Sequence, residues 1–171
     1  MICIDELGPL TARTYIGKGW APIDQPLRVA PDYGRRAFLW VFGAFEPKTG
    51  NAFTVCSVRR RSLDFVTFLD QTAQHWPNGE LIFIMDNLPV HKTMDVRLWA
   101  FAHKRVRFLF QPTYAPWLNL IEPWWKTLRS LALAGHRFEN TDDLRSSIVQ
   151  GTIYWNDHRH PFVWRKSYNS N

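Results

Sequence analysis

Cysteine is scarce in this sequence, and long apolar runs and targeting segments are missing from it. The two cysteines, Cys3 and Cys56, show no paired Cys/His spacing, which argues against a disulfide framework and a structural zinc site. No stretch approaches the ~18 consecutive apolar residues that a membrane span needs. No basic segment precedes an apolar one, as it would in a secretory signal. We therefore expect a cytoplasmic protein of one domain that has no membrane partner.

Acidic residues are outnumbered by basic ones, with 15 Asp and Glu against 21 Lys and Arg. The formal net charge is +6 and the pI is about 9.6, and most of the excess lies after residue 100. Such a balance favours a polyanionic partner such as nucleic acid. Charge alone does not decide the point, because many soluble proteins are mildly basic.

Apolar segments and turn-forming residues follow one another in an order typical of an α/β fold. Short apolar or β-branched runs predict strands at 1–5, 36–45, 51–58, 81–85 and 106–110. Apolar residues at helical spacing predict helices at 62–75, 94–103, 119–135 and 141–154. We expect a mixed sheet flanked by helices, with residues 7–33 mostly in loops and with Ser62 and Asn119 as helix caps.

Two of the expected strands end in an aspartate. Residues 1–5 (MICID) and 81–86 (LIFIMD) each place a carboxylate after an apolar run, and Glu122 follows Asp86 after 35 intervening residues. If the two strands are neighbours, their aspartates lie together on the rim of the core. Three acids on one rim are what a pair of divalent cations needs for phosphoryl chemistry. The sequence therefore indicates a divalent-metal site formed by Asp5, Asp86 and Glu122.

The helix expected from residue 119 indicates how Glu122 points. Its apolar stripe consists of Ile121, Trp124, Trp125, Leu128 and Ala132, with Leu131 at the edge. Glu122 lies ~100° from the centre of that stripe and shares a face with Lys126 and Arg129. We therefore expect Glu122 at the border of the packed face, with cations one and two turns along the helix.

Each acid also has an ordinary structural interpretation. Asp5 and Asp86 could simply end strands, and Glu122 could be a first-turn carboxylate that the helix dipole favours. Glu6 also fits this view, because on a strand its side chain should point to the face opposite that of Asp5. A lone acid is weak evidence for a site, so the hypothesis depends on the combination of the three.

Two longer segments resemble motifs of the DDE-superfamily transposases, in particular the mariner-like group and its bacterial insertion-sequence relatives. Residues 81–92 (LIFIMDNLPVHK) resemble the second-aspartate motif of that family, and residues 111–126 (QPTYAPWLNLIEPWWK) resemble its long and specific third-acid motif. Further likenesses are found at Asp5-Glu6, Leu39-Trp40 with the turn 47–50, 154–156 and 161–164. The resemblance spans essentially the whole chain.

The resemblance implies a ribonuclease-H-like fold in which Asp5, Asp86 and Glu122 bind two Mg²⁺ or Mn²⁺ ions and catalyse DNA strand cleavage and strand transfer. Candidates for orienting the acids or contacting DNA are Asn87, His91 and Asn119, although a turn role for Asn87 and a cap role for Asn119 stay open. Candidates for phosphate contacts are Lys92, Lys126, Arg129 and Arg137.

Relatives in this family normally carry helix-turn-helix modules ahead of the catalytic domain. We expect residues 1–171 to be a single catalytic domain without that DNA-recognition region, in the bacterial cytoplasm and associated with the nucleoid. The implied partners are DNA, as transposon ends and target, and either a second copy of the chain or a full-length transposase. Two alternatives stay open: a remnant that binds nucleic acid or a partner transposase without turnover, and a nuclease that uses the same acids on RNA–DNA hybrids.

Overall fold

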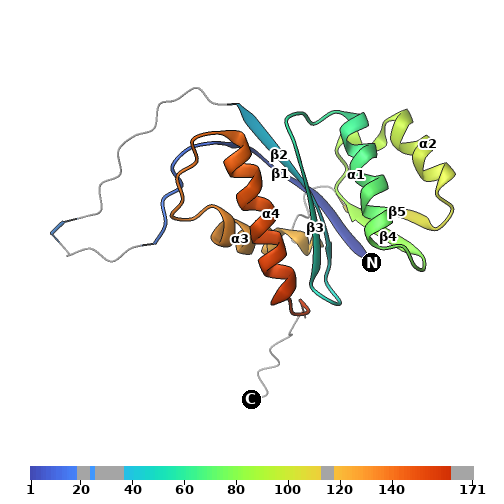
Figure 1. The fold of residues 1–171 in the computed structure, drawn as a ribbon. Helices are drawn as coiled ribbons and strands as arrows, with labels where there is room; N and C mark the ends of the chain where they lie inside the picture. Colours follow the sequence, from blue (N-terminus) through green and yellow to red (C-terminus); the bar gives the residue numbers. More distant parts are fainter. Residues whose placement is uncertain (19–23, 26–36, 113–117, 163–171) are drawn as a thin grey trace, which may run out of the picture.

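The computed structural model describes residues 1–18, 24–25, 37–112 and 118–162, which fold around a five-stranded sheet (Figure 1). The strands are β1 (Ile2–Thr11), β2 (Phe38–Glu46), β3 (Asn51–Ser57), β4 (Leu81–Met85) and β5 (Val106–Phe110). Their order across the sheet is β3-β2-β1-β4-β5. β2 runs antiparallel to both β1 and β3, whereas β1, β4 and β5 run parallel. The carboxyl ends of β1, β3, β4 and β5 therefore meet at one edge of the sheet.

Helices cover both faces of this sheet (Figure 1). α1 (Ser62–His75) and α2 (Met94–Ala102) pack on one face, and α3 (Ile121–Ala132) and α4 (Thr141–Asp157) pack on the other. A short 3₁₀ helix, η1 (Pro89–Lys92), connects β4 to α2. The mixed sheet flanked by helices is therefore as the sequence predicts. Across the described segments, no helix combines the length and the apolar character that crossing a membrane requires.

Successive residues of β1 enter two different hydrophobic layers. Cys3 and Leu7 pack under α3 and α4, whereas Ile2 and Ile4 pack under α1. This alternation follows from the two-residue period of a strand. β1 is thus buried on both faces and forms the centre of the molecule.

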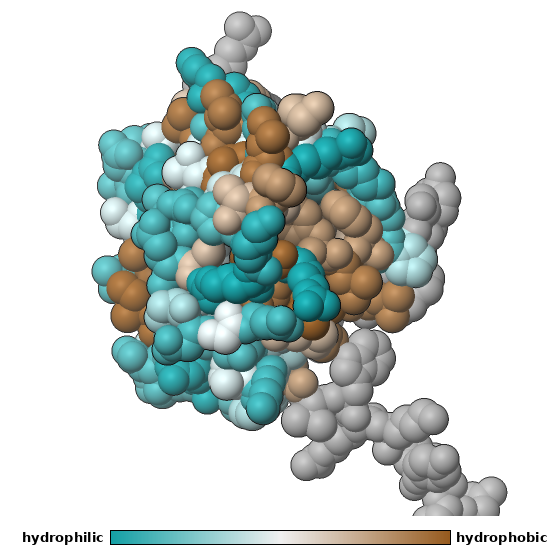
Figure 2. Space-filling model, turned by 90° about the vertical axis from the view of Figure 1, so that its right-hand side faces the viewer, coloured by the Kyte–Doolittle hydropathy of each residue, from teal (hydrophilic) through white to brown (hydrophobic). Residues whose placement is uncertain are grey.

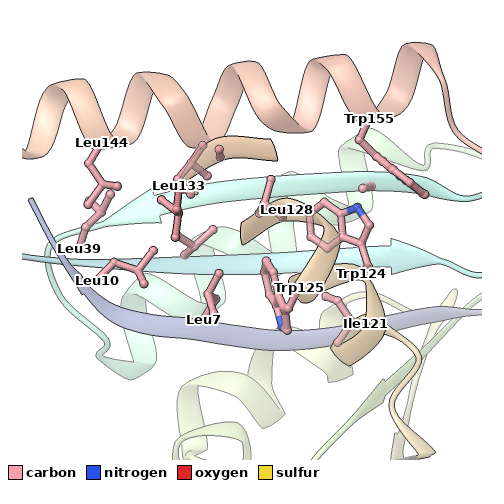
Figure 3. Packing of buried hydrophobic residues seen from close by; sticks show 14 of the residues in the cluster. Leu7, Leu10, Leu39, Ile121, Trp124, Trp125, Leu128, Leu133, Leu144 and Trp155 are labelled. Atoms are coloured by element: carbon pink, nitrogen blue, oxygen red, sulfur yellow. The ribbon is translucent and has the colours of Figure 1, made fainter. Parts of the chain in front are cut away.

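α3 buries the apolar stripe that its sequence predicts. The stripe lies against β1 and β2 and beneath α4 (Figure 3). Trp124 stacks on Phe45 of β2 with 5.8 Å between the ring centroids. The buried members are Ile121, Trp124, Trp125, Leu128 and Ala132, and Leu131 is half-buried at the edge.

The first strand is longer than the sequence predicts. The sequence predicts that residues 7–33 are mostly loop, but β1 continues to Thr11 through Gly8 and Pro9. The register between β1 and β2 shifts between Leu7 and Leu10, which lets the strand pass the proline and resume pairing. Residues 12–18 form no further strand, and residues 19–23 and 26–33 lie outside the described part of the chain.

Neither of the two predicted helix caps holds. Arg61 occupies the cap position of α1, and the Ser62 hydroxyl instead donates to Asp95 Oδ2 at 2.8 Å. Leu120 occupies the cap position of α3. The side chain of Asn119 is directed to β1 instead, because a tertiary acceptor is available there.

Apolar side chains remain at the surface on the side of α2 and β5. Met94, Leu98 and Phe101 of α2 and Leu109 of β5 are exposed. Figure 2 shows apolar groups between hydrophilic ones on this side. The described helices therefore leave part of this region uncovered.

Gly43 in β2 lies directly beneath Trp125 and leaves no space for a side chain. A Cβ added at Gly43 would lie 2.2 Å from Trp125 Cη2. Because the indole is buried, Gly43→Ala is expected to lower the free energy of unfolding by about 1–3 kcal/mol. Urea denaturation measures this change, with Ser130→Ala on the exposed face of α3 as a near-neutral reference. An unchanged midpoint for Gly43→Ala would contradict this close packing of Trp125 on β2.

Candidate active site

Asp5 and Asp86 lie at corresponding positions of two neighbouring parallel strands. The pairing of β1 with β4 ends at Cys3 and Ile84, which face each other in register. Asp5 and Asp86 are each two residues farther along, where β4 has ended and β1 continues beside β2. In open α/β sheets, ligands bind outside the carboxyl ends of strands that diverge in this way. The two strands are neighbours as predicted, but Asp5 lies within β1 and not at its end.

Asp5 is a mostly buried carboxyl group beneath α3. Trp125 Nε1 donates a hydrogen bond to Asp5 Oδ2 over 3.3 Å. Burial raises the pKa of Asp5 to about 7, and the negative charges of Glu6 and Glu122 act in the same direction. Glu122 is therefore a near neighbour of Asp5, although the two residues are far apart in sequence. A bound cation would relieve the same repulsion.

A buried histidine links Asp86 to Glu6. His91 Nδ1 lies 2.9 Å from Asp86 Oδ1, and His91 Nε2 lies 3.0 Å from Glu6 Oε1. Burial alone would lower the pKa of His91, but the hydrogen bonds and charges of the two carboxylates raise it to about 9. The imidazole is therefore protonated at neutral pH, and each ring nitrogen donates to a carboxylate.

Asp86 is held as an ionised, solvent-facing carboxylate. Partial burial acts to raise the pKa of Asp86, but hydrogen bonds from His91 and the Leu88 N–H, with the charges of His91 and Arg60, bring it below its ordinary value. Both hydrogen bonds are made to Oδ1, and the side chain is 41% exposed. Asp86 Oδ2 is therefore left available to a ligand.

Asn119 joins the start of α3 to β1. The Asn119 side-chain amide donates to the carbonyl of Ile4 over 3.1 Å, and the Asn119 carbonyl accepts from the Glu122 N–H over 3.1 Å. Asn119 is buried, whereas Glu122 is exposed in the first turn of α3. Glu122 is therefore more exposed than its predicted position at the border of the packed face implies. Asn119 positions that turn next to Asp5.

Asn87 fixes the chain immediately after Asp86. Its side-chain amide donates to the carbonyl of Gln111, and the Gln111 N–H donates to the carbonyl of Met85 over 2.9 Å. These contacts join the carboxyl ends of β4 and β5. Residues 113–117 of the third-acid motif lie outside the described residues.

The three carboxylates are chemically suited to bind a hard divalent cation, but they do not lie close enough together to coordinate one ion. Carboxylate oxygens are the ligands that Mg²⁺ and Mn²⁺ prefer. Within the described ranges, no three Asp, Glu, His or Cys side chains lie close enough together to hold a metal ion. The assignment of Asp5, Asp86 and Glu122 as metal ligands therefore stays a prediction.

Two of the predicted phosphate-binding residues line a cleft beside α3. Lys126 and Arg129 line a cleft of about 530 Å³ together with Lys18. The segment that carries Lys18 is held to the end of α3, because Tyr15 exchanges backbone hydrogen bonds of 2.9 Å with His136 and Gly135. The cleft therefore brings together three basic side chains from segments distant in sequence, among apolar lining residues.

The other two side chains predicted to bind phosphate lie outside this cleft. Lys92 ends η1, and its Nζ lies 5.0 Å from the ring centroid of Phe110. Arg137 forms an exposed ion pair with Glu139 over 2.9 Å. The four cations thus do not form one patch.

Glu6 and Trp125 also belong to the site, although the sequence pattern does not indicate this role for either residue. Glu6 points to the face opposite Asp5, as expected, but its side chain is only 2% exposed and ion-paired. Trp125 packs in the predicted stripe and also binds Asp5. Periodicity identifies the face of a strand or helix, but it does not identify a hydrogen-bond partner on another element.

Comparison with known proteins places the chain in a family. Residues 1–145 match the family model described as DDE superfamily endonuclease. The chain therefore belongs to the DDE superfamily of endonucleases, and the resemblance found in its motifs is confirmed.

One relative and two solved structures of another similar protein are informative. The chain is 27% identical over 123 residues to the "Insertion element IS630 uncharacterized 39 kDa protein" of Shigella sonnei, covering 71% of this chain and 36% of that protein. The Mos1 transposase paired-end complex with left transposon end matches with a TM-score of 0.62 and 15% identity, over 92% of this chain and 52% of that one. The Mos1 mariner paired end complex with Mn matches with a TM-score of 0.62 and 15% identity, over 91% and 52%.

These likenesses confirm the ribonuclease-H-like fold class. The chain spans about a third of the IS630 protein and about half of the Mos1 chains.

Proposed function

We propose that this chain is the catalytic part of a transposase, which cleaves DNA strands and transfers them with the help of divalent metal ions. The observation that carries the proposal is the placement of Asp5 and Asp86 at corresponding positions of adjacent parallel strands, with Glu122 near Asp5. Membership of the DDE superfamily of endonucleases supports the reaction class. The similar Mos1 structures are paired-end complexes, one of them with the left transposon end, which supports DNA as the substrate.

Asp5, Asp86 and Glu122 would hold two Mg²⁺ or Mn²⁺ ions, which when bound activate the attacking oxygen and stabilise the leaving oxygen at a phosphodiester. The chain's own residues prepare the acids for this task. Trp125 fixes Asp5, and His91 fixes Asp86 and keeps it ionised. Lys126 and Arg129 would bind backbone phosphates along their cleft, with Lys92 and Arg137 as phosphate contacts outside it.

The partners and the location follow from the same proposal. DNA would be bound as transposon ends and as target, by a homodimer or together with a full-length transposase. The protein would act in the bacterial cytoplasm, associated with the nucleoid. The relative from Shigella sonnei supports a bacterial insertion element as the source of the substrate.

A second candidate is a remnant that binds nucleic acid or a partner transposase without turnover. One observation favours it: among the described residues, the acids do not lie close enough together for three of them to hold a metal ion. The two candidates differ in whether a metal ion turns binding into cleavage.

Nicking of supercoiled plasmid with Mg²⁺ or Mn²⁺ separates these candidates. Wild type should nick the plasmid, and Asp5→Ala, Asp86→Ala and Glu122→Ala should each lower the rate by at least about 100-fold. Asp142→Ala, an exposed acid of α4, is the control and should nick like wild type. Circular dichroism would verify that each variant is folded.

Full nicking by any of the three variants would remove that residue from the site. DNA binding by wild type without any nicking in either metal would favour the remnant.

A further inference from the structure

Three consecutive arginines, Arg59, Arg60 and Arg61, follow β3 at the edge of the sheet that carries the acids. β3 runs in the same direction as β1 and β4, so its carboxyl end lies at the same edge as Asp86. Arg61 is neutralised by Asp64, with 2.9 Å between Nε and Oδ2. Among the described residues, no acid lies within ion-pair distance of Arg59 or Arg60. Their charges are therefore available to an anion from outside.

Arg60 is held in place by an aromatic ring. Its guanidinium carbon lies 4.6 Å from the ring centroid of Trp40 in β2. The ring also packs closely on Gly8, where an added Cβ would lie 3.0 Å from Trp40 Cε3. Gly8 has a φ of 147°, a backbone conformation that favours glycine. The absence of a side chain at Gly8 also leaves space for the indole. The contact with the ring restricts the position of the guanidinium, so Arg60 loses less conformational freedom when it binds an anion.

The stacked pair lies close to the acids. Arg60 is one of the positive charges that act on Asp86. Trp40 pairs with Ser57 at the end of β3, and along β2 it lies on the same face as Phe42, which pairs with Glu6. Trp40 therefore lies on the face of the sheet that carries Glu6, and the charge of Arg60 is near enough to act on Asp86.

We propose that Arg60, stacked on Trp40, is a phosphate-binding residue that holds a DNA backbone beside Asp86. A guanidinium binds two oxygens of a phosphate through parallel N–H groups, which a single ammonium does not do. Such a contact positions the strand without reading its sequence. The inference rests on the proposed function, because DNA is the ligand, and it identifies a contact separate from the Lys126 and Arg129 cleft.

DNA binding measured by fluorescence anisotropy over a series of salt concentrations tests the proposal. The measurement uses the whole chain, a labelled duplex and EDTA, so cleavage does not interfere. Arg60→Gln should weaken binding about five- to tenfold at low salt and make the slope of log K against log salt shallower by about 1. Arg60→Lys keeps the charge and loses the bidentate geometry, so it should keep the slope while binding more weakly than wild type.

Arg107→Gln is the matched control. Arg107 is an exposed arginine near the amino end of β5, paired with Glu80 over 3.4 Å and remote from the edge that carries Asp86. The control loses the same charge and should change the affinity less than about twofold. The Arg60 variants should also raise KM for plasmid nicking more than they lower kcat.

The outcomes separate this inference from the proposed function. Wild-type affinity and slope in Arg60→Gln, with nicking intact, would overturn the inference and leave the proposed function standing. Loss of affinity in Arg60→Gln but not in Arg107→Gln supports the phosphate contact, even if wild type nicks nothing and the proposed function fails. Equal losses in Arg60→Gln and Arg107→Gln would show a general charge effect and overturn the inference.

Discussion

Asp5→Asn is expected to stabilise the metal-free protein at pH 8 while abolishing nicking. Burial raises the pKa of Asp5 from 3.8 to about 7. A folded-state pKa that is raised gives stability that is present below pH 3.8 and lost as the pH rises through 7. At pH 8 the folded chain therefore contains a carboxylate that its surroundings disfavour. Asparagine keeps an oxygen to accept the Trp125 hydrogen bond and removes the charge, so the free energy of unfolding in EDTA should rise by about 2–4 kcal/mol.

Magnesium should narrow the difference in unfolding free energy between Asp5→Asn and wild type. A ligand that binds the folded state alone raises the free energy of unfolding by mass action, so Mg²⁺ should stabilise wild type and leave Asp5→Asn nearly unchanged. Urea denaturation at pH 5 and pH 8, with and without Mg²⁺, measures both effects. Asp142→Asn, on an exposed acid, should change neither the pH profile nor the response to metal. A variant less stable than wild type in EDTA at pH 8 would show that Asp5 is not destabilised by its burial.

Local pattern was enough to predict most of the helices and strands and the buried face of α3. The apolar runs at 81–85 and 106–110 coincide with β4 and β5, and the spacing from Ile121 to Ala132 places α3 with its buried side correct. These features depend on residues within a few positions of one another, so a periodic pattern records them. The adjacency of Asp5 and Asp86 follows once β1 and β4 pair in parallel.

Tertiary contacts decided the remaining features, and the sequence does not display them. Glu6 and His91 are 85 positions apart, and nothing near either residue indicates the other. Asparagine is a residue type that often caps helices, but the Asn119 side chain instead donates a buried hydrogen bond to the carbonyl of Ile4. Pro9 predicts a break, yet a register shift lets β1 continue past it. In each case a long-range partner outweighs the local preference.

Glu6→Gln is expected to destabilise the protein in a pH-dependent manner, because it removes one of the two carboxylates that keep His91 charged. The side chains of His91 and Glu6 are 0% and 2% exposed, so water cannot solvate the imidazolium after the Glu6 charge is removed. The pKa of His91 is raised to about 9 from 6.5, so this stabilisation is complete below pH 6.5 and lost as the pH rises through 9. At pH 6.5 the variant should lose about 2–3 kcal/mol of unfolding free energy.

The shape of the pH profile distinguishes this role from simple packing. Glutamine has the size of glutamate, so a packing defect would lower stability equally at every pH, whereas loss of the ion pair gives a difference that shrinks toward pH 10. Asp70→Asn is the matched control, because Asp70 lies 3.5 Å from His103 in a pair that is 46% and 32% exposed. That exposed pair should cost less than about 1 kcal/mol. NMR titration of His91 provides the direct check: the pKa of His91 should fall in Glu6→Gln, and an unchanged value would show that Asp86 alone keeps the imidazole protonated.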